Sequence, residues 1–246
     1  MRRVAATTLG LALVLGLLGL VVLVLFLRPL PAEPDALAAL RSDQDVAVSQ
    51  TATTLTLAPS GPTGTGVVFL PGARVDPRAY AGLLREVAEA GSLVVVVKPP
   101  LDLALLAGGA VRRVVVAHPE VVTWVLAGHS VGAAAATAEV AARPGWYDGL
   151  LLWAPIPGAD VSALDDLPVT AIIGTADVYA TAANVAETRA LLPDSTTYVV
   201  LKGAVHRSFG DYAVQVEVGV PGASEADLDA RIVDESLRLL DRAECG

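Results

Sequence analysis

Residues 121–136, VVTWVLAGHSVGAAAA, contain the stretch that decides the fold of this chain. An apolar run over residues 121–127 leads directly into the pentapeptide Gly128-His129-Ser130-Val131-Gly132, and an alanine-rich segment follows. A strand, a tight turn and a helix in immediate succession form the setting in which a G-x-S-x-G motif projects its serine hydroxyl above a sheet. The two glycines let the backbone pass through a turn that is too tight for side chains. The simpler alternative is that Ser130 only caps the following helix.

Short apolar runs lie on both sides of this stretch, and segments with helical spacing separate them. The runs are Gly66–Leu70, Leu93–Val97, Val121–Ala127, Gly149–Trp153, Val169–Ile173 and Tyr198–Leu201. The helices are expected at Pro77–Ala90, Ser130–Ala142, Asn184–Leu192 and Ser224–Ala243. Runs rich in Val and Leu suit parallel strands that helices cover on both faces. The alternation predicts an α/β fold with a doubly wound, mostly parallel sheet.

Two further features complete the expected domain. Alternating residues over 46–57 indicate a β-hairpin that precedes the parallel strands. Between the runs Gly149–Trp153 and Val169–Ile173, the segment Ala154–Leu167 has only 14 residues. One average helix takes about 11–12 residues, so this connection is too short for a multi-helix cap.

The N-terminal segment is the most apolar part of the chain. Val4–Leu27 is a run of 24 residues without a charge, and roughly 20 apolar residues suffice to cross a bilayer. Arg2 and Arg3 precede the run, which by the positive-inside bias places the N-terminus in the cytoplasm. We therefore expect a signal anchor or transmembrane helix over residues 1–28, a proline-containing extended linker over 29–45 and the domain over 46–246.

This organisation predicts a single-pass protein of the cell membrane whose domain lies outside the cytoplasm. A cleaved signal peptide, which would give a secreted protein, is one alternative, although its apolar region is normally about 7–15 residues long. A buried core helix is another. The residues after Arg28 include 26 acidic and 14 basic side chains, a net charge of −12. Nucleic acid is therefore not expected as a partner, because binding to phosphates requires Lys and Arg.

A serine hydroxyl becomes a good nucleophile only when a neighbouring base accepts its proton. The chain has three histidines. His129 lies inside the pentapeptide with its side chain pointing away from that of Ser130, and His118 precedes the strand at the opposite end of the sheet. His206 follows the run Tyr198–Leu201, near the carboxyl end of a late strand, where ligands gather in open α/β sheets. Elimination therefore makes His206 the expected base.

The base in turn needs an acid that fixes its tautomer. Asp177 follows the run Val169–Ile173 and gives the chain order Ser130, Asp177, His206 that this fold class uses. Asp160, in the loop after Gly149–Trp153, is the alternative acid. The oxyanion hole needs two backbone N–H donors, and we expect them at Val131, directly after the serine, and at Ala73, in the loop after the run Gly66–Leu70.

These residues resemble the α/β-hydrolase superfamily and, within it, the bacterial "alpha/beta hydrolase fold-5" family related to dienelactone hydrolases. The likeness covers roughly residues 46–243. It rests on residues 70–80, 97–101, 128–132 and 174–177 and on His206 with the segment 209–212. The resemblance implies a hydrolase without a metal or cofactor. Dienelactone hydrolases use a cysteine where Ser130 stands here, so their lactone substrate is not carried over.

The sequence therefore predicts a serine hydrolase that acts on small-molecule esters through Ser130, His206 and Asp177. The alternative, from a different class, is a membrane-tethered binding protein that keeps the fold without turnover.

Overall fold

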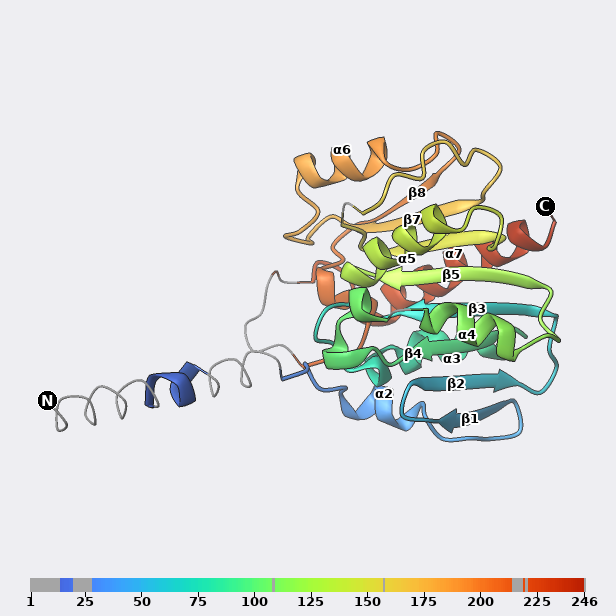
Figure 1. The fold of residues 1–246 in the computed structure, drawn as a ribbon, viewed down its shortest axis with the longest axis horizontal. Coiled ribbons are helices and arrows are strands. Elements are labelled where there is room, and N and C mark those ends of the chain that lie inside the picture. The colour runs from blue at the N-terminus through green and yellow to red at the C-terminus, as the bar shows by residue number, and fades with distance from the viewer. Residues whose placement is uncertain are drawn as a thin grey trace, which may run out of the picture.

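The computed structural model describes residues 14–19, 28–107, 109–156, 158–213, 219 and 221–245. In it, the six apolar runs and the expected hairpin form one eight-stranded sheet (Figure 1). The strands are β1 (Val46–Gln50), β2 (Thr54–Pro59), β3 (Thr65–Leu70), β4 (Leu93–Val97), β5 (Thr123–His129), β6 (Gly149–Trp153), β7 (Val169–Gly174) and β8 (Thr197–Leu201). Their order in the sheet is β1-β2-β4-β3-β5-β6-β7-β8. β1 and β2 form the expected antiparallel hairpin, β2 pairs antiparallel with β4, and all other pairs are parallel. The prediction of a mostly parallel sheet is confirmed.

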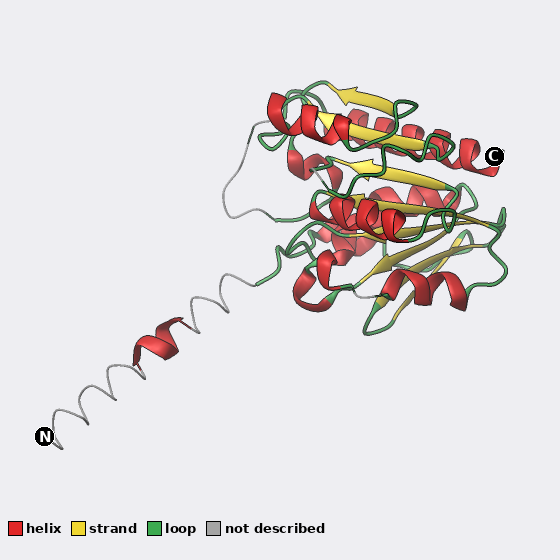
Figure 2. Ribbon diagram, turned by 45° about the horizontal axis from the view of Figure 1, so that its top comes forward, coloured by secondary structure: helices red, strands yellow, loops and turns green. Residues whose placement is uncertain are grey.

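Helices cover both faces of the sheet, as Figure 2 shows. The longer ones are α3 (Ala81–Glu89), α4 (Ala110–Ala117), α5 (Val131–Ala142), α6 (Ala182–Ala190) and α7 (Glu225–Glu244). Short helical turns are α2 (Pro34–Ala38), η1 (Pro77–Tyr80), η2 (Pro100–Asp102), η3 (Ala104–Leu106) and η4 (His206–Phe209). The sequence predicts every longer helix except α4, whose run AVRRVVVA is rich in β-branched residues.

The core has two layers because successive strand residues point to opposite faces. On one face, Val67 and Phe69 of β3 pack with α3 and α7. On the other face, Val68 and Leu70 of the same strand pack with α4 and α5. Every residue of β3 is buried, as expected for a strand covered on both sides. The connection from β6 to β7 contains only bends and turns in its described residues, 154–156 and 158–168, and so builds no helical cap over the sheet edge.

Residues 30–38, which the sequence analysis places in an extended linker, pack against the domain. Leu30 forms a β-bridge with Val75, and Ala32 forms one with Tyr212. Residues 34–38 are the helix α2, in which Ala36 is fully buried. Prolines favour an extended chain, but backbone hydrogen bonds to two loops hold this chain against the domain.

The predicted anchor, residues 1–28, falls outside the described residues except for residues 14–19, which are helical and exposed, and Arg28. Within the described parts of the chain, no helix is both long enough and apolar enough to cross a membrane.

A group of carboxylates lies where α3 meets α7. Asp229 on α7 is half-buried, and the burial, together with the charges of Asp211, Glu225 and Glu86, raises its pKa to about 7. The usual pKa of an aspartate in an unfolded chain is about 3.9. The folded state therefore binds the proton more tightly, and the stability from this proton is present below pH 4 and lost as the pH rises through 7.

We expect Asp229→Asn to be more stable than the wild type at pH 8 by about 1 kcal/mol, a value reduced from the full shift because solvent screens a half-buried carboxyl. The gain should vanish near pH 4. Urea unfolding at both pH values measures it. Asp241→Asn, at an exposed position of the same helix, is the control and should show no such pH dependence. Equal stability of Asp229→Asn and wild type at pH 8 would contradict the carboxylate cluster.

Candidate active site

Ser130 is the single residue between strand β5 and helix α5. Its backbone has φ 55° and ψ −118°, a conformation that costs a non-glycine residue about 1–3 kcal/mol. Hydrogen bonds hold this turn: the Ser130 N–H donates to the Trp153 carbonyl at 3.0 Å, and the Ser130 carbonyl accepts from the Ala133 N–H at 3.0 Å. The turn therefore fixes the serine at the carboxyl end of the sheet.

The flanking glycines are required by contact with backbone atoms. A Cβ at Gly132 would lie 2.0 Å from the carbonyl oxygen of Leu70. A Cβ at Gly128 would lie 2.4 Å from the carbonyl carbon of Gly132. Helix α5 thus begins in direct contact with the end of β3, which leaves no room for a side chain at Gly132, and it lies so close to β5 that Gly128 has no room for one either.

The structure brings two of the predicted site residues into hydrogen-bond contact. The Nδ1 atom of His206 lies 2.7 Å from Oδ2 of Asp177, and the side chains are 15% and 2% exposed. The other carboxylate oxygen of Asp177 accepts from the Tyr179 N–H at 2.8 Å. When Nδ1 donates to the carboxylate, the Nε2 atom of the neutral ring is left as the proton acceptor.

The alternative residues lie elsewhere. Asp160 is exposed, and its carboxylate accepts from the N–H of Ser162 in its own loop. His118 pairs with Glu120 before the start of β5. The structure shows no hydrogen bond between Ser130 Oγ and His206 among the described residues. Such bonds are often long in ligand-free enzymes and tighten when substrate binds. The ring of His206 contacts instead the ring of His129, the residue before Ser130, with centroids 4.7 Å apart.

Two backbone N–H groups near Ser130 are available to a ligand. Val131 is the first residue of α5, so its N–H has no acceptor within the helix. In the loop after β3, the N–H of Gly72 donates to Tyr80 Oη and the N–H of Arg74 donates to the Asp102 carbonyl. The N–H of Ala73, between them, has no acceptor in the part of the chain that the structure describes. An oxyanion hole needs N–H donors that are not already bonded, and the two residues remain a prediction for that role.

Residues 28–33 form backbone hydrogen bonds with this loop. The Leu30 N–H donates to the Arg74 carbonyl at 2.5 Å, and the Leu30 carbonyl accepts from the Asp76 N–H at 3.0 Å. The same segment reaches the chain that follows His206, since the Glu33 N–H donates to the Asp211 carbonyl at 2.9 Å. The N-terminal segment of the domain therefore contacts the two loops that carry Ala73 and His206.

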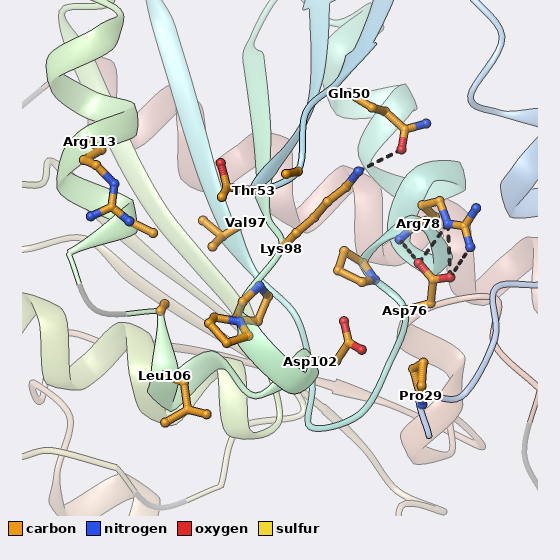
Figure 3. Close-up of a pocket in the computed structure, with 16 residues that line it drawn as sticks. Pro29, Gln50, Thr53, Asp76, Arg78, Val97, Lys98, Asp102, Leu106 and Arg113 are labelled. Atoms are coloured by element: carbon orange, nitrogen blue, oxygen red, sulfur yellow. Dashed lines mark hydrogen bonds and ion pairs between the residues drawn. The ribbon is translucent and has the colours of Figure 1, made fainter. Parts of the chain in front are cut away.

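A cavity of about 630 Å³ lies beside the same loop, at the ends of β2 and β4 (Figure 3). Lys98 reaches across it to the side-chain oxygen of Gln50 at 2.9 Å, while Arg78 and Asp76 form an ion pair. Neither Ser130 nor His206 lines this cavity. Among the described residues, no group of three His, Cys, Asp or Glu side chains could hold a metal ion.

The pair Tyr80 and His129 was not predicted from the sequence. Tyr80 Oη lies 2.9 Å from His129 Nδ1, and both side chains are buried. The sequence feature that could have pointed to the pair is Tyr80, because aromatic residues make up only 4% of this chain.

The fold and the strand–serine–helix turn together define an α/β hydrolase. The family model described as "Alpha/beta hydrolase family" matches residues 66–225, and the chain belongs to this family. No curated protein matches the chain.

Solved structures agree on the fold. A putative dienelactone hydrolase from Klebsiella pneumoniae subsp. pneumoniae MGH 78578 superposes with a TM-score of 0.58 and 14% identity, covering 80% of this chain and 99% of that one. Thermogutta terrifontis esterase 2, phosphonylated by sarin, gives a TM-score of 0.58 at 12% identity, covering 81% and 95%. An alpha-beta serine hydrolase homologue from Coxiella burnetii gives 0.54 at 17% identity, covering 79% and 98%.

We expect Gly132→Ala to destabilise the protein by about 3 kcal/mol or more, because its Cβ would overlap backbone oxygens that no rotamer change can move. Gly61→Ala is the matched control: a Cβ there meets nothing within 4 Å, so the change should stay within about 0.5 kcal/mol. Urea unfolding of the two variants measures the difference. Equal stability of the two variants would show that α5 is not held against β3 as described.

Proposed function

We propose that this protein is a serine hydrolase that cleaves ester-type bonds of small molecules through Ser130, His206 and Asp177. The observation that carries the proposal is the hydrogen bond between His206 Nδ1 and Asp177 Oδ2 at the same sheet edge as the strained Ser130 turn. A base oriented by a buried acid, beside a serine in this turn, is the arrangement that activates a hydroxyl.

In the proposed reaction, Ser130 Oγ attacks the carbonyl carbon of the ester while His206 Nε2 accepts the hydroxyl proton. The N–H groups of Val131 and Ala73 stabilise the negative oxygen of the tetrahedral intermediate. His206 then passes the proton to the leaving alcohol, which leaves an acyl group on Ser130. A water molecule, activated by His206 in the same way, releases the acid and restores the serine.

We expect a fluorophosphonate probe to label the wild type at Ser130 and not to label Ser130→Ala.

Asp177→Asn should lower kcat by about 10³- to 10⁴-fold, because the asparagine amide favours the wrong tautomer of His206. Asp160→Asn, which changes an exposed carboxylate, is the matched control and should keep the wild-type kcat. The measurement is hydrolysis of p-nitrophenyl butyrate.

Two outcomes would contradict the proposal. An unlabelled, inactive wild type would favour the alternative, a binding protein that keeps the fold without turnover. Loss of activity in Asp160→Asn but not in Asp177→Asn would move the acid to Asp160.

We also propose that residues 1–28 anchor the domain to the cell membrane, with the domain outside the cytoplasm. The support is the uncharged run Val4–Leu27 and the preceding Arg2 and Arg3. The full chain should then stay in the membrane pellet at high salt. A chain beginning at Arg28 should be soluble and active, because residues 28–33 keep their contacts with the loop that carries Ala73 and the segment that follows His206. Recovery of a soluble form cleaved near Ala32 from cells would contradict the anchor and indicate secretion.

A further inference from the structure

Two buried side chains link the loop that carries Ala73 to the residue beside Ser130. Tyr80 is 0% exposed and His129 is 1% exposed. The N–H of Gly72 donates to Tyr80 Oη at 2.8 Å, and Tyr80 Oη lies 2.9 Å from His129 Nδ1. A chain of two hydrogen bonds therefore runs from the loop that carries Ala73 to His129 of the pentapeptide.

The backbone N–H of Gly72 can only donate, so Tyr80 Oη accepts in that bond. The phenol proton of Tyr80 is assigned to the bond with His129 Nδ1, because this buried O–H has no other acceptor among the described residues. The His129 ring is then neutral, with its proton on Nε2. The pKa values agree: burial raises the pKa of Tyr80 well above its ordinary value, and burial, followed by the neighbouring His206, lowers the pKa of His129 well below its ordinary value.

The pair is in contact with both ends of the candidate site. A Cβ at Gly72 would lie 2.8 Å from His129 Nδ1 and 3.0 Å from Tyr80 Oη, so the loop backbone rests directly on the two side chains. On its other side, the His129 ring packs against His206, with centroids 4.7 Å apart, and against Phe209, with centroids 5.7 Å apart and an interplanar angle of 24°. Its Nε2 atom is buried and has no hydrogen-bond partner among the described residues.

We propose that Tyr80 and His129 are positioning residues that hold the Ala73 N–H and the His206 ring in the correct positions relative to Ser130. The inference rests on the proposed function, since it assigns these residues to the same reaction. Neither side chain needs to touch the substrate. Tyr80 fixes the peptide plane that ends at Gly72, and this plane precedes the Ala73 N–H by one residue. His129 supports the face of the His206 ring.

Positioning of this kind acts on the transition state more than on substrate binding. A donor misplaced by about 1 Å can cost on the order of 100-fold in rate. The oxyanion forms only during the reaction. A tilted Ala73 N–H therefore stabilises the tetrahedral intermediate less, while the affinity for the ester stays almost unchanged. The expected signature is therefore a loss in kcat with a constant KM.

The test is Tyr80→Phe, which removes one oxygen atom and keeps the ring. We expect kcat for p-nitrophenyl butyrate to fall about 10- to 100-fold, while KM changes less than about two-fold. Phenylboronic acid mimics the tetrahedral state: Ser130 Oγ adds to boron and its proton passes to His206. Its inhibition constant should rise by the same factor by which kcat/KM falls.

The matched control is Tyr147→Phe. Tyr147 is also buried, and its hydroxyl donates to Glu139 at 2.9 Å, far along α5 from Ser130. This variant should lose stability but keep the wild-type kcat, which separates positioning from general destabilisation. His129→Phe should behave like Tyr80→Phe, and the double variant should be hardly slower than either single one, because the two residues act as a unit.

A measurement on the wild type does not depend on any variant folding. Nitrogen NMR of the histidine rings should show His129 neutral, with the proton on Nε2, throughout pH 5–8. A proton on Nδ1, or an unchanged kcat in Tyr80→Phe of an active enzyme, would overturn this inference alone. A rise in KM that accounts for the whole loss would overturn it as well. A wild type that neither reacts with fluorophosphonate nor hydrolyses the ester would overturn the proposed function together with it.

Discussion

The contact between the start of α5 and the end of β3 is the constraint on which the candidate site depends. Only one residue joins β5 to α5, so the helix must pass directly against the carbonyl oxygen of Leu70, and a Cβ at Gly132 would stand 2.0 Å from that oxygen. This approach has two consequences at once. It forces Ser130 into positive φ, and it places the first N–H of the helix beside the loop that carries Ala73. Ser130, the proposed nucleophile, and the expected oxyanion donors are thus positioned by one packing contact.

The sheet could be predicted because its physical signal is local. Parallel strands that are buried on both faces need continuous apolar runs, and runs such as Leu93–Val97 carry this information in five consecutive residues. The position of residues 30–38 could not be predicted in this way. Leu30 is held by backbone bonds to Arg74 and Asp76, and backbone bonds leave no mark on the side-chain pattern. Helix α4 was missed because three consecutive valines, 114–116, are equally compatible with a buried strand.

The same distinction applies to the candidate site. The proximity of Asp177 and His206 follows from topology, because each residue comes after one of the neighbouring strands β7 and β8 at the same sheet edge. His129 is not predicted as the base because its side chain points away from that of Ser130. The direction of the side chain does not reveal which residue contacts the ring. The partner, Tyr80, lies 49 positions away in sequence, and no local pattern joins the two.

Two histidines with ring centroids 4.7 Å apart raise the question of which one carries a proton during turnover. In the proposed reaction, His206 becomes positively charged when it accepts the serine proton, and the buried Asp177 carboxylate compensates that charge. A second charge on His129 would oppose this step by direct repulsion. Burial of the His129 ring disfavours such a cation. In the proposed arrangement the Tyr80 phenol also donates to Nδ1, which leaves this atom no place for a second proton. His129 thus supports His206 as a polarisable neutral ring, and the acceptance of the proton is confined to one of the two histidines.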